Sequence, residues 1–291
     1  MISTVGGMRM RRGLAVALLF AACARTAFAA AYDDFSRGIS ANFAGNNDLA
    51  IQSFTSALSA GDLAEAYVPQ AHLGRARAYL AKGKCAEALA DLDETLKTKT
   101  ADALPYMLRA EANICLRKVD EAQKDFAAAV GLRPEADFFW SFARNQWFLG
   151  RFSDAAENFA QANKHATKDD THRPYYLLWQ ALSAERAGTL DHAAFASAVS
   201  ALDLDDWPEP ILEFYKGTLS AENVYRKAAS RDSALAGQQK CEADFYLGEW
   251  HLAHKNVADA KTLLQQAADS CPHNFVEANA AKAEAEPKSQ A

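Results

Sequence analysis

The chain has 291 residues, half of them hydrophobic, with only 14 glycines and 8 prolines, a composition that suits a mainly helical protein with a large core. The formal net charge is −6, and the segment 1–29 carries four arginines and no other charge, so its removal leaves −10. So acidic a chain is a poor partner for nucleic-acid phosphates and for anionic lipid. We therefore expect no nucleic-acid binding.

Residues 1–29 have the pattern of a signal peptide. Arginines at positions 9, 11 and 12 precede an apolar run that is too short to span a bilayer, and residues 27–29 read Ala-Phe-Ala, which fits the A-x-A cleavage rule. We predict cleavage after Ala29 and export to the periplasm. An alternative is lipidation at Cys23, because residues 20–23 approximate a bacterial lipobox with Phe in place of Leu. The chain would then be anchored to the outer membrane, and we expect membrane attachment only in that case.

Residues 30–201 contain a repeated helical hairpin. The clearest copy runs from Pro105 to Pro134, in which Ala122, Phe126 and Pro134 match the A-x3-F…P half of the tetratricopeptide pattern. That pattern has a period of about 34 residues, and Ala88 lies one such period before Ala122. Small residues let paired helices cross closely, and one hairpin cannot bury its apolar face alone. We predict an all-α solenoid of antiparallel hairpins, with repeats 1–5 in residues 30–201, of which the fifth is degenerate.

The C-terminal part continues this pattern less regularly. The matching alanines Ala193 and Ala260 are separated by almost two periods, so we expect a degenerate helical pair in residues 202–240. Residues 241–285 are predicted to form a sixth repeat and a capping helix, because a solenoid must close its exposed end. The polar tail, residues 286–291, is predicted to be disordered.

Four cysteines remain after the signal peptide, and they allow three pairings. In the repeat register, Cys85 begins a second helix and Cys115 ends the next first helix, so both lie at the same end of neighbouring helices. Cys241 is expected to begin a first helix and Cys271 to end its partner. We predict the disulfides Cys85–Cys115 and Cys241–Cys271, each contributing about 3–4 kcal/mol. Buried free thiols are the alternative.

No enzyme motif is present: the sequence lacks G-x-S-x-G, H-E-x-x-H and the glycine-rich loops that bind phosphates or dinucleotides. His251 and His254 are three residues apart, but no third ligand has a comparable spacing, so a packing role is favoured over metal binding. We expect no catalytic residue, no cofactor and no metal.

Binding is the remaining class of function. In this repeat class the first helix of each hairpin lines the concave face, and Trp140, Arg144 and Trp147 recur at i, i+4 and i+7, which places them on one stripe. Tryptophan and arginine often dominate interface energies. The other residues expected to line this partner-binding groove are Arg77, Met107, Glu111, Ile114 and Tyr175. The alternative is that both tryptophans pack between neighbouring first helices.

The C-terminal half resembles a known family. Residues 214–220 (Phe-Tyr-Lys-Gly-Thr-Leu-Ser) after Trp207-Pro208, residues 245–248 (Phe-Tyr-Leu-Gly) and residues 273–277 (His-Asn-Phe-Val-Glu) are similar to NlpI-type bacterial tetratricopeptide lipoproteins. The resemblance implies a homodimeric envelope scaffold that presents murein hydrolases to a periplasmic protease. We therefore expect a non-catalytic adaptor for protein partners in cell-wall regulation. Alternatives are a peptide or muropeptide carrier and a structural component of an outer-membrane assembly complex.

Overall fold

The computed structural model describes residues 30–98, 101–202, 204–229 and 232–285. Every regular element in these ranges is a helix, so the all-α prediction is confirmed. The expected cleavage site, Cys23 and the tail at 286–291 lie outside the described residues. None of the described helices has both the length and the hydrophobicity needed to cross a membrane. The chain divides into two compact units, Met1–Arg133 and Pro134–Ala291, which are described separately.

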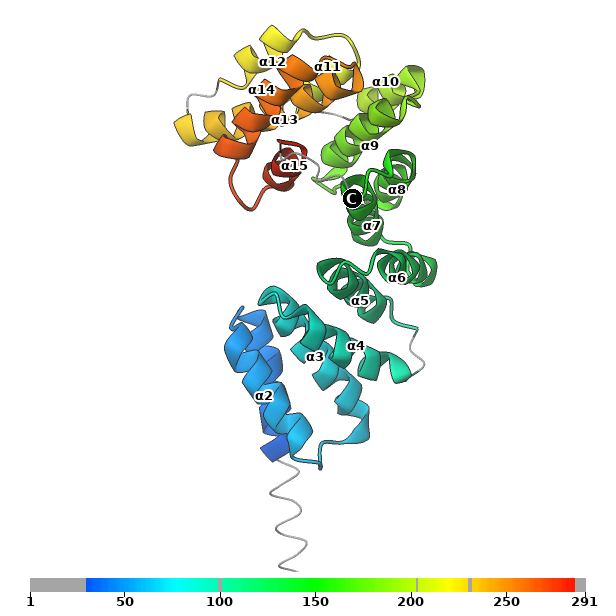
Figure 1. The fold of residues 1–291 in the computed structure, drawn as a ribbon, viewed down its shortest axis with the longest axis vertical. Coiled ribbons are helices and arrows are strands. Elements are labelled where there is room, and N and C mark those ends of the chain that lie inside the picture. The colour runs from blue at the N-terminus through cyan, green and yellow to red at the C-terminus, as the bar shows by residue number, and fades with distance from the viewer. Residues whose placement is uncertain (1–29, 99–100, 203, 230–231, 286–291) are drawn as a thin grey trace, which may run out of the picture. The chain divides into compact units, whose positions relative to one another are not determined.

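The first unit is a succession of packed helices. After a helix over residues 30–43, its elements are α2 (Asn47–Ser59), η1 (Glu65–Tyr67), α3 (Val68–Ala81), α4 (Cys85–Lys97), α5 (Leu104–Cys115) and α6 (Val119–Leu132). From α2 onward, each α-helix packs on the next α-helix in the chain (Figure 1). Proline lies in the first turn of α3 and of α5, where no backbone donor is lost.

Phe54 is the centre of the first unit's N-terminal core. The ring is fully buried on α2, and glycines from two other helices, Gly38 and Gly74, lie against it. A Cβ atom at Gly38 would lie 2.8 Å from the ring, and one at Gly74 would overlap it. The absence of a side chain at these positions is therefore what lets the helices approach each other around Phe54.

The second unit begins with the same succession and then adds a longer helix. Its elements are α7 (Ala136–Phe148), α8 (Phe152–His165), α9 (Arg173–Ala187), α10 (His192–Ser200), α11 (Glu209–Tyr215), α12 (Ala221–Lys227), α13 (Ser233–Ala253), α14 (Val257–Ser270) and α15 (Val276–Ala285). Helix α9 packs against α8 and also against α13, although α10, α11 and α12 intervene in the chain. Its buried Trp179 and Leu182 belong to the same core as Phe245 and Tyr246 of α13. This contact joins the two halves of the unit.

The turns within the hairpins share a left-handed residue. Gly83, Gly150 and Gly188 have φ between 69° and 72° at this position, where glycine has no steric penalty. The hairpins α5–α6 and α13–α14 use Arg117 and Lys255 instead, with φ of 59° and 63°. A side chain in this region costs about 1–2 kcal/mol, so these two turns are strained where the others are not.

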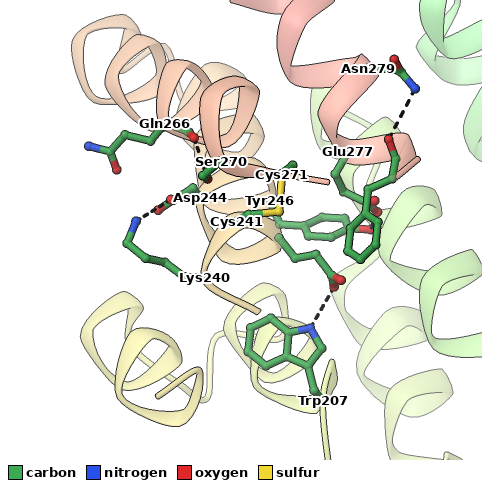
Figure 2. Close-up of a disulfide and its surroundings, with 12 residues drawn as sticks. Trp207, Lys240, Cys241, Asp244, Tyr246, Gln266, Ser270, Cys271, Glu277 and Asn279 are labelled. Carbon is green, nitrogen blue, oxygen red and sulfur yellow. Dashed lines mark hydrogen bonds and ion pairs between the residues drawn. A yellow bond between two sulfur atoms is a disulfide. The ribbon is translucent and has the colours of Figure 1, made fainter. Parts of the chain in front are cut away.

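The structure contains both predicted disulfides. Cys85 is the first residue of α4 and Cys115 the last of α5, and their Cα atoms are 6.1 Å apart. The second bridge joins Cys241 to Cys271, with Cα atoms 5.1 Å apart (Figure 2). The expectation that Cys241 begins a helix is wrong, because α13 starts at Ser233 and is longer than its partner α14. The end of α14 therefore lies beside the middle of α13, and the bridge forms there.

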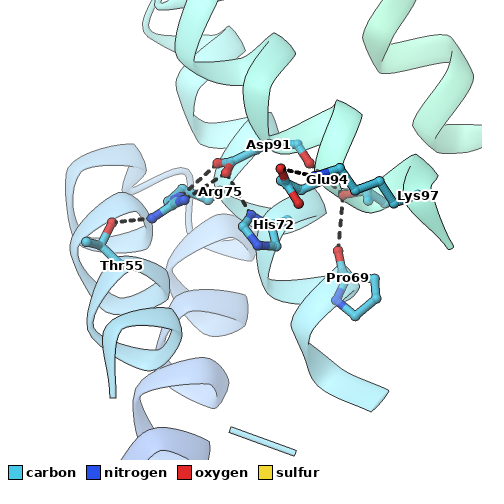
Figure 3. Close-up of polar contacts among 8 residues, drawn as sticks. Thr55, Pro69, His72, Arg75, Asp91, Glu94 and Lys97 are labelled. Atoms are coloured by element: carbon cyan, nitrogen blue, oxygen red, sulfur yellow. Dashed lines mark hydrogen bonds and ion pairs between the residues drawn. The ribbon is translucent and has the colours of Figure 1, made fainter. Parts of the chain in front are cut away.

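Two equivalent ion pairs mark the repeat in the first unit. Arg75 of α3 donates two hydrogen bonds to Asp91 of α4, at 2.8 and 2.7 Å, and His72 contacts the same carboxylate (Figure 3). One period later in the chain, Arg109 and Asp125 make the same two-point contact at 2.9 and 2.7 Å. Both carboxylates are buried. Burial by itself would raise the pKa of Asp91, but the hydrogen bonds and the charge attraction of Arg75 and His72 together hold it below its ordinary value.

Candidate functional site: a pocket in the second unit

A pocket of about 460 Å³ opens in the second unit between two pairs of helices, α7 with α9 and α13 with α15, that are far apart in the chain. These four helices contribute to it, together with the residues just before α9 and α15. Its lining residues are Asp137, Trp140, Arg144, His172, Tyr175, Tyr176, Glu242, Asn274, Phe275, Val276 and Glu277. The exposed residues are Asp137, His172 and Asn274, whereas Tyr176, Glu242 and Glu277 are buried. The pocket thus has a polar rim, aromatic walls and an acidic floor.

The predicted stripe on α7 is divided between the pocket and the core. Trp140 and Arg144 are half-buried and line the pocket. Trp147 is only 2 % exposed, so its assignment to a binding groove is wrong. Its ring lies 5.2 Å from Trp179 and 6.4 Å from Phe245, between α7 and the helices α9 and α13. The alternative of packing between neighbouring helices is therefore correct for Trp147.

Arg144 is the basic residue of α7 in the pocket wall. Its side chain makes no hydrogen bond or ion pair with the part of the chain that the structure describes. Trp140, one turn earlier, contacts Phe159, Tyr176 and Trp179 with ring centroids 5.1–5.8 Å apart. This packing fixes the indole ring, so the wall of the pocket is rigid beside a guanidinium group that is available to a ligand.

Glu242 of α13 forms one half of the acidic floor. The residue is 6 % exposed, and its Oε2 atom accepts a hydrogen bond from the Tyr175 hydroxyl at 3.1 Å. The same oxygen accepts a second bond from Trp207 Nε1 at 2.8 Å, which Figure 2 draws as the dashed line from the labelled tryptophan. Burial, with the nearby carboxyl of Glu277, raises the pKa of Glu242 to about 7.

Glu277, the second residue of α15, forms the other half of the acidic floor. It is 4 % exposed, and its Oε1 accepts hydrogen bonds from the Tyr246 hydroxyl at 2.8 Å and from Trp179 Nε1 at 3.4 Å. Burial raises its pKa above the ordinary value, against the opposing effect of these donors. Each carboxyl is thus held by one tyrosine and one tryptophan.

The predicted groove residues of the first unit differ in their exposure to solvent. Arg77 is exposed and lines a smaller pocket of about 180 Å³ together with Phe43, whose side chain is 88 % exposed. Glu111 is exposed and Ile114 half-buried on α5. Met107 is 4 % exposed, so its assignment to an open groove is wrong, because α5 turns this position into the core. Of the predicted set, Trp140, Arg144 and Tyr175 meet in one pocket.

The sequence reasoning missed both glutamates of the floor. A signal was present for Glu242, which lies four residues before Tyr246 and seven before Glu249, and therefore on one face of α13. All three residues are buried. A charged residue on the buried face of a helix indicates a buried polar site. The hydrogen-bond partners of Glu242 come from other segments of the chain, so the spacing of residues along α13 does not predict them.

The two histidines that were considered as a metal pair have other contacts. His254 stacks on Trp250 with ring centroids 3.9 Å apart, and His251 Nδ1 lies 3.2 Å from the side-chain amide of Asn256. Within the described ranges, no group of three or more His, Cys, Asp or Glu side chains is placed to hold a metal ion.

No family model matches the sequence. Among solved structures, the chain is similar to a tetratricopeptide repeat protein from Parabacteroides merdae, with a TM-score of 0.55 and 16 % identity over 87 % of this chain and 98 % of that one. It is also similar to the C-terminal part of a TPR repeat-containing protein from Cytophaga hutchinsonii, with a TM-score of 0.50 and 14 % identity over 84 % of this chain and 98 % of that one. At such identities the likeness shows the fold alone, which is that of tetratricopeptide repeat proteins.

Proposed function

We propose that this protein is an exported, non-catalytic scaffold that binds a protein partner at the pocket of the second unit. The arginine-rich, apolar start of the chain supports export, and the resemblance of residues 207–277 to NlpI-type proteins supports a role in the regulation of peptidoglycan hydrolases by a periplasmic protease. A net charge of −10 after signal removal favours protein partners over nucleic acid or anionic membranes.

One observation carries the proposal. Three residues that the repeat register assigned to a binding surface, Trp140, Arg144 and Tyr175, converge on one pocket although they come from two helices. The pocket combines rigid aromatic rings with a guanidinium group that has no partner within the described residues. Rigid aromatic side chains and arginine are the groups that most often anchor a protein interface.

The proposal is tested by affinity purification from an envelope extract with quantitative mass spectrometry. The double variant Trp140→Ala/Arg144→Ala is expected to lose the partners that the unmodified protein retains. Because Trp140 contacts three aromatic rings, the helicity of this variant is first checked by circular dichroism. Arg144→Ala alone provides a second test, since it removes the half-buried guanidinium group without removing core packing.

Arg226→Ala is the matched control, because Arg226 lies on α12 with its side chain 69 % exposed and is not among the pocket residues. Loss of partners with the pocket variants alone supports the proposal. Retention of every partner by a folded double variant and by Arg144→Ala would place the binding surface elsewhere on the protein.

A peptide or muropeptide carrier is the second candidate. The observation that favours it is the volume of the pocket, about 460 Å³, which lies in the range typical of small-ligand sites. A carrier would bind an isolated peptide or muropeptide with a change in tryptophan fluorescence, without any protein partner.

A further inference from the structure

We propose that the pocket of the second unit recognises a lysine or arginine side chain of the partner polypeptide, with the cationic group on Glu242 and Glu277 and the aliphatic stem along Trp140 and Tyr175. This inference rests on the proposed function, because it names the chemical group through which the partner is held. Four observations support it: the charge of the floor, its hydrogen bonds, the nature of the walls and the disulfide behind them.

The floor lacks a positive charge. The pKa of Glu242 is affected by burial, by Glu277 and by the donors Trp207 and Tyr175, and no basic side chain contributes. The groups that favour the charged form of Glu277 are the donors Tyr246 and Trp179 and its own backbone N–H, which are likewise neutral. When two carboxyls lie close together in a buried site, ionisation of both is unfavourable unless a cation lies beside them. A bound ammonium or guanidinium group would supply that missing charge.

The hydrogen bonds leave room for such a group. Both donors to Glu242 use its Oε2 atom, and both side-chain donors to Glu277 use Oε1. Oε1 of Glu242 accepts no hydrogen bond from the part of the chain that the structure describes. Glu242 is more than nine-tenths buried yet lines the pocket, so this oxygen is available to a donor that enters from it. The protein fixes the carboxyl through one oxygen and leaves the other for a ligand.

The walls suit an aliphatic stem that ends in a cation. Trp140, Tyr175, Tyr176 and Phe275 line the pocket, and the faces of aromatic rings attract cations. Lysine and arginine bury their methylene groups along apolar surface while the charged head reaches a polar site. An anionic ligand could pair with Arg144 in the wall but would meet the two carboxyls of the floor. No third ligand group is present for a metal ion within the described residues.

The second disulfide supports the wall that carries Phe275. Cys241, which Figure 2 shows bridged to Cys271, directly precedes Glu242 in the sequence. Cys271 leads into the short segment that contains Asn274 and Phe275 and then enters α15. The bridge therefore ties the segment that forms one wall to the helix that provides the floor. Such a constraint holds the carboxyls and the aromatic wall in place before a ligand arrives, which lowers the entropic cost of binding.

The test uses the full-length protein without its signal segment and the peptide acetyl-Ala-Ala-Lys-Ala-Ala-amide, with norleucine in place of lysine as the neutral control. Binding is followed by tryptophan fluorescence, since all five tryptophans lie in residues 134–291. At pH 8 we expect saturable binding of the lysine peptide and at least about tenfold weaker binding of the norleucine peptide. Glu242→Gln is expected to weaken the lysine peptide about tenfold, whereas Glu222→Gln, an exposed carboxylate on α12, leaves it unchanged.

A pH series separates the carboxyls from other titrating groups. The charged or titratable side chains that line the pocket besides Glu242 are Asp137, Arg144, His172, Tyr175, Tyr176 and Glu277. Binding of the lysine peptide is expected to weaken between pH 8 and pH 5.5, because Glu242 takes up a proton there. A pH dependence that is retained in full in Glu242→Gln would contradict the role of Glu242.

Equal binding of the two peptides, or no saturable binding of either, would overturn the inference. The proposed function has a separate readout. If Glu242→Gln retains every partner that Trp140→Ala/Arg144→Ala loses, the pocket surface binds a protein but not through a basic side chain. If both variants are folded and retain every partner, the proposed function fails as well.

Discussion

Replacing Glu242 by glutamine is expected to stabilise the protein at neutral and alkaline pH, although the carboxylate it replaces accepts two well-formed hydrogen bonds. The glutamine carbonyl can accept the hydrogen bonds that Tyr175 and Trp207 donate to Oε2. Its amide group then takes the position of Oε1, beside the pocket, where water can reach it. The substitution thus preserves the shape and the contacts and removes only the buried charge.

The magnitude follows from the pKa of this group. In the unfolded chain Glu242 ionises with a pKa near its ordinary value of 4.5, whereas burial in the folded protein raises the pKa to about 7. The folded state therefore holds a proton that the unfolded state has lost between these two values, and stability falls as the pH rises through this window. At about 1.4 kcal/mol for each tenfold change in the ionisation equilibrium, the loss is on the order of 3 kcal/mol above pH 7.

The assay is urea unfolding of the oxidised protein at pH 5 and pH 8, followed by tryptophan fluorescence. This signal reports the second unit, which contains every tryptophan. At pH 5 the carboxyl is protonated in the folded state, so the variant and the unmodified protein are expected to differ little. At pH 8 the variant is expected to be more stable by up to about 3 kcal/mol.

A variant that is less stable at both pH values would refute this reasoning, because it would show that ionised Glu242 contributes a net stabilising interaction within the folded chain. Glu222→Gln serves as the control and is expected to leave the difference between the two pH values unchanged, since its carboxylate is exposed. If the peptide titration also gives the expected result, the buried charge of Glu242 both lowers the stability of the folded protein and binds a cation.

Three further outcomes concern the first unit, measured by circular dichroism during urea unfolding. Gly74→Ala is expected to destabilise it by about 1–3 kcal/mol, because the new methyl group overlaps the Phe54 ring; an unchanged midpoint would contradict this close approach. Arg117→Gly removes the strain of a side chain at a positive φ and is expected to raise the free energy of unfolding by about 1 kcal/mol. A decrease in that free energy would show that the turn is not strained. Asp125→Ala leaves the guanidinium of Arg109 with only the exposed carboxylate of Asp93 and is expected to cost about 3 kcal/mol, whereas a loss below about 1 kcal/mol would show that Asp93 and water compensate for the buried partner.

The sequence by itself determined the helical hairpins, because their pattern is local. Alanine, glycine and aromatic residues recur with the period of the tetratricopeptide pattern, and prolines lie at helix starts such as those of α5 and α9. The same register places Cys85 and Cys115 at one end of neighbouring helices, where the structure joins them. Contacts between consecutive helices follow from the spacing of the repeat residues along the sequence, so the sequence is enough to predict them.

The tertiary structure decided which residues form the pocket and which lie in the core. Trp140 and Trp147 belong to the same stripe of α7, yet one lines the pocket and the other is buried against Trp179. The difference arises because α13 packs on α9 and its Phe245 closes over Trp147. That contact joins segments separated by three helices, and no periodicity along the chain encodes it. The acidic floor has the same origin, since its two carboxyls meet only after α13 and α15 have packed beside α9.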